Sequence, residues 1–562
     1  MVMNDNKIIN LNIKIVFLLL FVAFASCKKD YLTVQPKDQV TDAILWSSTD
    51  NADVFLNNIY GSIPGSFNSL DPQENFSDNS INGIMVAASQ TIYATSIYTA
   101  NDNISFNSAK DYGDTQGEGW EALYTDIRKC NLFIQKVTDA HFSDLAWEKQ
   151  RLAEARFLRA YFYQSLWIQY GGVPIITEVL NVDTQGDAIF RARNTDTETF
   201  QFIDDECGAI ANDLPVTAEP GRITKGAALA LKGWCELFEA SPLKNPSNDK
   251  TKWALAAATN KEIIDMGVYS LFPDYNALFY EENNNNEEVI FAKEYLGKTS
   301  LGSSKEEDWG PPALGLFTTS GILPTQEVVD EYAMSNGLQI TDPASGYDPQ
   351  NPYVNREKRF YQSIVYDGSM WTGYLMSMRQ GSGLATSLNA TSQSRFIGYF
   401  MRKGMSEEYS SHPANSPSSA NEIIYRYAEV LLSYAEAQNE AVGPDISVYE
   451  AINQVRVRSD LPPLPAGLSQ IQMRDAIYRE RRVELAFENK RFYDLLRLKL
   501  AEEKLNGSLH AILIKEVNGI LQYSAIPALS GSRKFYANKN YLLPIPQSAI
   551  DQNSKLVQNP GY

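Results

Sequence analysis

AEARFLRAYFYQSLWIQYGGVP, residues 153–174, decides the fold of this chain. Its apolar and small side chains recur at spacings of three and four, which predicts a helix with one broad buried face: Phe157, Leu158, Tyr161, Phe162, Ser165, Leu166 and Ile168. The Gly-Gly pair at 171–172 can adopt the left-handed cap conformation, and Pro174 cannot continue a helix. Arg156 and Arg159 lie off this face, where we expect them to meet carboxylates. The stretch therefore predicts a central scaffold helix.

The N-terminus resembles the export signal of a bacterial lipoprotein. An apolar run of about 11 residues, Ile15 to Ala25, follows two lysines and is too short to span a bilayer, which needs roughly 20 residues. Small residues then precede Cys27, as in a lipobox, where a peptidase cuts and the cysteine is acylated. We predict a signal peptide over residues 1–26, a lipid anchor at Cys27 and a tether over residues 27–48. Ordinary signal cleavage with an incidental Cys27 is the alternative.

Composition excludes several classes of function. The chain has 562 residues and a formal charge of -19, whereas nucleic-acid binding needs a basic surface. The histidines are few and far apart: His141, His412 and His510. The cysteines after Cys27 lack the spacing of a disulfide framework or zinc site, and we expect them to be small buried side chains: Cys130, Cys207 and Cys235. We predict no metal and no cofactor.

The mature chain divides into three parts by hydrophobic periodicity. Helical patterns fill residues 49–267 and return over residues 419–562, whereas residues 268–418 are rich in Gly, Ser, Asn and Pro with one short apolar stretch, Glu288 to Ala292, that predicts a strand. Helix pairs cannot bury their apolar faces alone, so we expect them to stack. The predicted fold is mainly α, with tetratricopeptide-like helix pairs forming a scaffold and a large irregular region carrying the ligand face.

The densest charge lies within a predicted helix from Gln470 to about Leu500. Its acidic and basic residues alternate at four and three: Arg481, Glu484, Glu488 and Arg491. A glycosidase would need two carboxyl groups about 5 to 9 Å apart across a cleft. Two glutamates one turn apart between arginines favour mutual neutralisation instead. We predict a structural ion-pair network that includes Arg426 and Glu436 of the preceding helix, and we expect no catalytic residue, because no nucleophile or phosphate-binding motif occurs.

The ligand-binding signal consists of aromatic, amide and carboxylate side chains in segments without helical periodicity. Aromatic faces stack on sugar rings or apolar peptide side chains, and neighbouring polar groups bind hydroxyls or backbone. The predicted ligand-binding residues are Asp78, Asn79, Tyr93, Tyr98, Asn101, Asp102, Trp309, Trp371 and Tyr374. For each of them, local packing within a loop is the alternative interpretation.

The order of motifs resembles the SusD/RagB family of outer-membrane nutrient-binding lipoproteins. The resemblance begins with RFLRAYFY and YGGVP in residues 156–174 and extends along nearly the whole chain. Further matching motifs lie at residues 30–36, 124–131, 221–228, 355–364, 426–437, 451–458, 480–488, 491–495 and 558–562. One such motif is weak evidence, but this many in the family's order is strong evidence.

The resemblance implies a single SusD-like domain over residues 49–562, without catalysis. It further implies a lipid-anchored protein on the outer membrane, attached through its N-terminal lipid only, that binds oligosaccharide or polysaccharide and delivers it to a SusC-like TonB-dependent transporter for nutrient uptake. The family's ligand residues do not transfer, because the loops that carry them vary between members. Three alternatives stay open: a peptide-capturing member of the family, a surface glycoside hydrolase, and a scaffold that only assembles the transporter.

Overall fold

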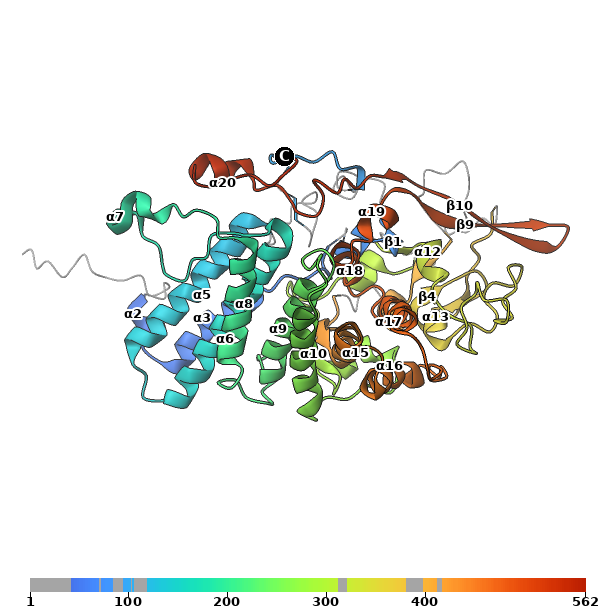
Figure 1. The fold of residues 1–562 in the computed structure, drawn as a ribbon. Helices are drawn as coiled ribbons and strands as arrows, with labels where there is room; N and C mark the ends of the chain where they lie inside the picture. The colour runs from blue at the N-terminus through green and yellow to red at the C-terminus, as the bar shows by residue number, and fades with distance from the viewer. Residues whose placement is uncertain are drawn as a thin grey trace, which may run out of the picture. The chain divides into compact units, whose positions relative to one another are not determined.

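The computed structural model describes residues 42–69, 72–83, 94–102, 104–105, 119–311, 321–380, 398–411 and 417–562 (Figure 1). The predicted signal peptide, Cys27 and most of the tether lie outside the described residues. The chain forms two compact units, Met1–Phe55 and Leu56–Tyr562. Helix α2 spans Asp42–Leu45 in the first unit. Helix α3 spans Thr49–Gly61 and crosses the boundary between the units. All sites discussed below lie in the second unit.

Eight long helices of the second unit form a continuous array, which appears side by side in Figure 1. Helix α5 packs on α6, α6 on α8, α8 on α9, α9 on α10, α10 on α15, and α15 on both α16 and α17. Their bounds are Trp120–Ala140 (α5), Leu145–Tyr170 (α6), Asp196–Ile210 (α8), Lys225–Ala240 (α9), Lys250–Asp265 (α10), Tyr427–Val442 (α15), Ile446–Arg458 (α16) and Gln470–Glu484 (α17). The predicted helical scaffold is therefore confirmed.

Short elements connect this array and fill the region between α10 and α15. The short helices are η2 (Gln73–Phe76), α7 (Val182–Gln185), η3 (Gly186–Ile189), η4 (Ala277–Phe279), η5 (Glu281–Asn283), α11 (Lys305–Trp309), α12 (Gln326–Val329), α13 (Lys358–Ser363), α14 (Glu407–Ser411), α18 (Arg491–Arg497), α19 (Ala501–Lys504) and α20 (Gln547–Gln552). Among the described residues, no helix is both long and apolar enough to cross a membrane.

The described strands form antiparallel pairs, of which three join separated segments of the chain and two, β5–β6 and β9–β10, are hairpins. The pairs are β1 (Ser80–Ile81) with β3 (Leu323–Pro324), β2 (Val289–Lys293) with β8 (Glu422–Arg426), β4 (Ile364–Val365) with β7 (Phe400–Met401), β5 (Met370–Trp371) with β6 (Tyr374–Leu375), and β9 (Gly507–Val517) with β10 (Ile520–Arg533). The strand predicted near Glu288 is confirmed as β2. The β9–β10 hairpin was not predicted, although its turn residues Asn518 and Gly519, with φ of 52° and 80°, form the dipeptide that tight hairpins prefer.

Helix α6 lies between α5 and α8 in the helical array. Asp144 caps its first turn by accepting hydrogen bonds from the N–H groups of Ala146 and Trp147, and Gly171 ends it with a φ of 73°. The helix is buried on all sides from Phe157 onward, rather than on one face as its periodicity predicts. The polar face of the helix can also be buried because its charged side chains form ion pairs: Arg159 donates a hydrogen bond to Glu206 of α8 at 2.6 Å.

Gly172 explains why the helix must stop with a glycine pair. A Cβ atom at this position would lie 2.2 Å from the backbone oxygen of Asn194, which cannot move without shifting the entry into α8. We expect Gly172→Ala to lower the free energy of unfolding by about 1–3 kcal/mol, measured by urea denaturation. The matched control is Gly208→Ala on the exposed side of α8, where a Cβ meets nothing within 4 Å. This control should stabilise the fold by about 0.5–1 kcal/mol, and equal effects of the two changes would contradict the account.

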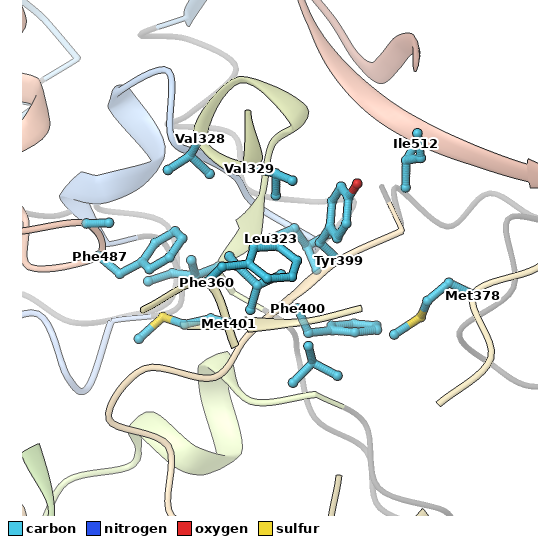
Figure 2. Packing of buried hydrophobic residues seen from close by; sticks show 14 of the residues in the cluster. Leu323, Val328, Val329, Phe360, Met378, Tyr399, Phe400, Met401, Phe487 and Ile512 are labelled. Atoms are coloured by element: carbon cyan, nitrogen blue, oxygen red, sulfur yellow. The ribbon is translucent and has the colours of Figure 1, made fainter. Parts of the chain in front are cut away.

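The irregular part has an apolar core of its own (Figure 2). Buried side chains from β3, α12, α13, β7 and β9 converge there, together with the turn after α17. They include Leu323, Val328, Val329, Phe360, Met378, Tyr399, Phe400, Met401, Phe487 and Ile512. This core holds the many short elements together without long helices.

The predicted single helix from Gln470 to about Leu500 is wrong. Helix α17 ends at Glu484, and α18 begins only at Arg491. Between them Phe487 and Asn489 adopt φ values of 64° and 60°, which break a right-handed helix. The turn allows Phe487 to enter the apolar core while the charged residues on either side reach different partners.

The charged residues of this region form a buried ion-pair network. Arg426 contacts Glu484 at 2.7 Å and Glu488 at 2.6 Å, and all three side chains are buried. The other pairs are Arg481 with Glu429 at 3.1 Å and with Asp494 at 3.0 Å, Glu436 with Arg497 at 2.8 Å, and Arg491 with Asp78 at 2.7 Å. Glu484 and Glu488 therefore neutralise basic side chains inside the fold.

Burial also accounts for the cysteines. Cys130, Cys207 and Cys235 are free and fully buried, as predicted. Burial raises the pKa of each thiol above its ordinary value, so each stays protonated and unreactive at neutral pH. These residues act as small packing groups of the helical array.

Candidate ligand-binding cleft

A cleft in the described part of the chain has a volume of about 1260 Å³. It lies between the first helices and the irregular part. Its walls come from the end of α3, the segment 62–69, the first half of α5, residues 220–222 before α9, the end of β2, and residues 300–301. Typical small-molecule pockets have volumes of about 300–1,000 Å³. The cleft is therefore large enough for an oligomeric ligand.

One side of the cleft is a loop held by a single carboxylate. Glu422 of β8 accepts hydrogen bonds from the backbone N–H of Ser66 at 2.8 Å and from its hydroxyl at 2.6 Å. Gly65 allows this close approach, because a Cβ there would lie 2.5 Å from Lys293 Cδ and 2.7 Å from the Tyr295 hydroxyl. The loop is thus fixed to β8, beside Tyr295, which follows the end of β2.

Tyr295 provides an aromatic surface in this wall. Its half-buried ring stacks on Phe67, with centroids 5.7 Å apart and planes inclined by 17°, and its hydroxyl donates to Glu422 at 3.1 Å. Lys293 Nζ lies 5.6 Å from the ring centroid. Phe67 and Glu422 therefore fix the ring in place before any ligand arrives, which lowers the entropy cost of stacking a ligand against it.

Tyr60 is a second aromatic residue of the wall, and Arg222 lies against its ring. The Arg222 guanidinium lies 5.4 Å from the Tyr60 ring centroid, and both side chains bond to the buried Glu154, at 3.1 Å from Arg222 and 2.7 Å from Tyr60. Burial and the neighbouring Glu154 raise the pKa of Tyr60 well above its ordinary value. The phenol therefore stays neutral and keeps its hydrogen bond across the physiological range.

The charges around the cleft balance. Its described lining contains three acidic residues, Glu121, Asp126 and Glu294, and three basic residues, Lys129, Arg222 and Lys293. Hydroxyl and amide groups complete the polar surface: Asn57, Ser62, Asn68, Ser69, Ser105, Thr125 and Ser300. Within the same described part, no group of His, Cys, Asp or Glu side chains is arranged to hold a metal ion. This composition suits a neutral ligand with many hydroxyl groups.

The structure places three of the predicted ligand residues inside the fold. Asp78 is buried against Arg491 and Arg482, and these arginines outweigh burial to hold its pKa well below the ordinary range. Asn79 is fully buried and donates to Glu74 at 2.8 Å. Tyr98 is also fully buried, and its hydroxyl accepts a hydrogen bond from Asn540 Nδ2 at 2.6 Å. These side chains stabilise the fold and leave no surface for a ligand.

The two tryptophans predicted as ligand platforms are also buried. Trp309 and Trp371 each expose 1% of their surface and belong to the apolar core of Figure 2. The Trp309 indole donates to the backbone oxygen of Ser69 at 2.8 Å, so it supports the loop of the cleft from behind. Their large apolar area explains the burial, because the irregular part needs such side chains to form a core.

The remaining predicted ligand residues lie outside the described cleft wall. Tyr374 exposes 51% of its surface on the β5–β6 hairpin. Asn101 and Asp102 are exposed in a turn, where Asp102 accepts a hydrogen bond from Thr99 N–H at 2.6 Å. Tyr93 lies outside the described residues. The structure thus brings none of the described candidates, Tyr374, Asn101 and Asp102, into the cleft wall beside Tyr295.

Sequence analysis missed the residues that line the cleft. Tyr295 and Lys293 follow the predicted strand directly, and a strand end that enters an irregular region is a common place for binding groups. Arg222 precedes a helix cap at Thr224, where the glycine beside it, Gly221, adopts a φ of 79°. Neither signal shows which distant segments meet there.

Comparisons with known proteins agree with this architecture. A family model described as "SusD family" matches residues 287–562, and one described as "Starch-binding associating with outer membrane" matches residues 30–233. SusD-like protein P2 of Formosa agariphila is 27% identical over 73% of this chain and 74% of its own length.

Two crystal structures from Bacteroides fragilis are similar throughout. A SusD-like protein has a TM-score of 0.75 and 27% identity, covering 93% of this chain and 99% of its own. A SusD-like carbohydrate binding protein has a TM-score of 0.72 and 26% identity, covering 91% of this chain and 100% of its own. With both halves matched by family models and the helical array shared, the chain belongs to the SusD/RagB family.

Proposed function

We propose that this protein is a cell-surface lipoprotein that captures oligosaccharides or polysaccharide in the cleft around Tyr295. The single observation that carries the proposal is the pre-fixed Tyr295 ring in a cleft with balanced charge. A sugar ring has an apolar C–H face that stacks on such a ring, and its hydroxyls match the Ser, Thr and Asn groups around it. The family model named for starch binding and the carbohydrate-binding relative support the same ligand class.

The proposal includes anchoring at Cys27 and handover of the glycan to a SusC-like TonB-dependent transporter. Its support is the lipobox pattern at the N-terminus, together with a family model described as associating with the outer membrane. Radiolabelled palmitate incorporated into the wild type but not into Cys27→Ala would support the anchor. Co-purification of a TonB-dependent transporter with the native protein would support the handover, and its absence from cross-linked outer membranes would contradict it.

Affinity gel electrophoresis of the whole protein in detergent against a panel of polysaccharides tests the capture. We expect one polysaccharide to retard the wild type, and Tyr295→Ala to weaken binding at least about ten-fold, because a central aromatic anchor is lost. Tyr295→Phe keeps the ring and should keep most of the affinity. Tyr374→Ala removes an exposed tyrosine outside the cleft and should change nothing.

Each other outcome has a definite meaning. Retardation that Tyr374→Ala abolishes and Tyr295→Ala leaves unchanged would place the site on the β5–β6 hairpin. If the protein bound peptides and no polysaccharide retarded it, the ligand would be a peptide and not a glycan. Release of reducing ends from the polysaccharide during incubation would establish a glycosidase. A protein that binds the polysaccharide without hydrolysing it should release no reducing ends.

A further inference from the structure

Strand β10 of the long C-terminal hairpin has one backbone edge that faces away from β9. Val517 and Ile520 lie opposite each other across the turn of Asn518 and Gly519. Residues that flank a two-residue turn exchange backbone hydrogen bonds, and bonded and non-bonded pairs then alternate along the two strands. The register therefore directs the N–H and C=O groups of every second residue of β10 outward: Leu521, Tyr523 and Ala525.

The outer edge of β9 follows the same alternation, and its outward groups have partners. The N–H of His510 donates to Glu327 at 3.0 Å, and the carbonyl of Ile514 accepts from the N–H of Gln380 at 2.9 Å. Within the part of the chain that the structure describes, no such bond reaches the outward groups of β10 between positions 521 and 525. The hairpin is therefore closed along β9 and open along β10.

The open edge is uncharged and of defined length. Proteins commonly protect an exposed strand edge with charged side chains, proline or a bulge. No charged residue occurs between Ile520 and Ser532, although 21% of the residues of the chain are charged. Proline and a bulge are present only at the far end, where Pro527 cannot donate a hydrogen bond and the register shifts after it. This combination favours a short, specific strand contact.

The side chains of the open segment leave the edge accessible. Ile520 exposes 66% of its surface, and Gln522 and Ser524 are exposed as well. Tyr523 is half-buried, because its ring packs edge-to-face on Tyr353 with centroids 5.6 Å apart. This contact holds the strand against the apolar core of the irregular part, so the edge is presented by a fixed strand.

The sequence of the open segment is complementary to itself. Two β10 strands can run antiparallel with Tyr523 opposite Tyr523 of the partner subunit and Leu521 opposite Ala525 of the partner subunit. The outward groups then form about six hydrogen bonds between the chains. Gln522 lies opposite Ser524 of the partner subunit, which is a polar pair, and no like charges meet. The pairing has the two-fold symmetry that is usual for homodimers.

We propose that the outer edge of β10 is a homodimer interface, at which two copies join their hairpins into one four-stranded sheet. The pairing goes beyond glycan capture and does not depend on it. It buries much less surface than the roughly 1,200 Å² of a stable complex, so free chains should associate weakly. Anchoring at Cys27, as proposed above, would confine the copies to one surface and raise their effective concentration.

Cysteine cross-linking of the whole protein in detergent tests the register. In this pairing, directly opposed residues have Cα atoms about 4.5 Å apart, within disulfide range, whereas diagonal residues lie about 7–8 Å apart. A mixture of Gln522→Cys and Ser524→Cys should therefore form a disulfide-linked dimer at least about ten-fold faster than either variant alone. Gln522→Cys mixed with Lys515→Cys is the control, because Lys515 lies on β9. The described natural cysteines are buried and should not compete.

A second change removes one donor from the edge. Ala525→Pro, added to both cysteine variants, deletes an outward N–H that β9 does not use, so the hairpin should stay folded and the cross-link should be lost. Pro527→Ala restores an N–H at the next outward position and should keep the cross-link. Persistence of the link with Ala525→Pro, or equal rates in all mixtures, would overturn the proposal. Disulfides formed only with other envelope proteins would assign the edge to a foreign strand and overturn it too.

Hydrogen exchange tests the unmodified protein and does not depend on any variant folding. The backbone amides of Leu521, Tyr523 and Ala525 should exchange more slowly as the concentration of the wild type rises, because pairing protects them. Exposed amides at the hairpin tip, Asn518 and Gly519, serve as the internal control and should not change. Exchange at the three outward amides that is independent of concentration up to the millimolar range would contradict pairing through β10.

Discussion

Arg426→Ala should lower the free energy of unfolding by about 3–5 kcal/mol, because it strands buried carboxylates. The Arg426 side chain exposes 1% of its surface and contacts Glu288 at 2.6 Å, Glu484 at 2.7 Å and Glu488 at 2.6 Å. It thereby joins the irregular part to the turn between α17 and α18. Urea denaturation of the wild type and the variant measures the difference. The comparison requires that both proteins have the same dependence of unfolding free energy on urea concentration.

The matched control for this change is Arg191→Ala. Arg191 also forms an ion pair, with Glu178 at 2.7 Å, but both side chains are largely exposed, at 41% and 54%. An exposed pair contributes about 0–1 kcal/mol. If Arg426→Ala cost no more than Arg191→Ala, the buried network would not hold the two parts of the structure together.

Acid should destabilise the fold through the same network. Burial raises the pKa of Glu484, but Arg458, Arg426 and Arg359 outweigh it and hold the pKa well below the ordinary value. Arginines likewise lower the pKa values of Asp78, Glu488 and Asp494. A carboxyl whose folded pKa is depressed contributes stability above its unfolded pKa of about 4, and that stability is lost as pH falls. We expect a loss of about 1–2 kcal/mol per carboxyl between pH 5 and pH 3.

Above about pH 4.5, Glu236 should have the opposite effect and lower the free energy of unfolding as the pH rises. Burial outweighs the neighbouring Lys232 and raises the pKa of Glu236 to about 7. A raised carboxyl pKa contributes stability that is present below about pH 4.5 and is lost as pH rises toward 7. Unfolding free energy should therefore peak on the acid side of neutrality. Glu236→Gln should remove the fall in unfolding free energy between about pH 4.5 and pH 7, and it should leave the loss of stability between pH 5 and pH 3 unchanged. If the unfolding free energy of the wild type did not change between pH 3 and pH 5, the ion-pair network would not stabilise the fold.

The helical array was predictable because its signals are local. The cap at Thr224, whose hydroxyl accepts from Ala227 N–H at 3.3 Å, and the stop at Gly171 depend on a few neighbouring residues. Arg426, which was expected within the helix that precedes residue 470, instead ends strand β8, and helix α15 begins at Tyr427, because β8 pairs with β2. This pairing joins segments more than a hundred residues apart and leaves no local signal beyond two adjacent isoleucines.

Which residues of the irregular segments line the cleft was not predictable for the same physical reason. Asp78 lies in a polar segment and was therefore predicted to bind ligand, but its partner Arg491 lies 413 residues further along the chain. Trp309 is buried by contacts with the distant loop of Ser69 and Phe67. Tyr295 lines the cleft because Glu422 and Phe67 hold it there. Exposure in an irregular region depends on such long-range contacts.

The most direct test is a crystal structure of the protein with the oligosaccharide that best retards it. The account predicts sugar rings in the cleft, with one ring stacked on Tyr295 and hydroxyls near Arg222 and Lys293. An oligosaccharide bound elsewhere, with the cleft empty and Tyr295 free of sugar, would contradict the proposal that this cleft captures glycans.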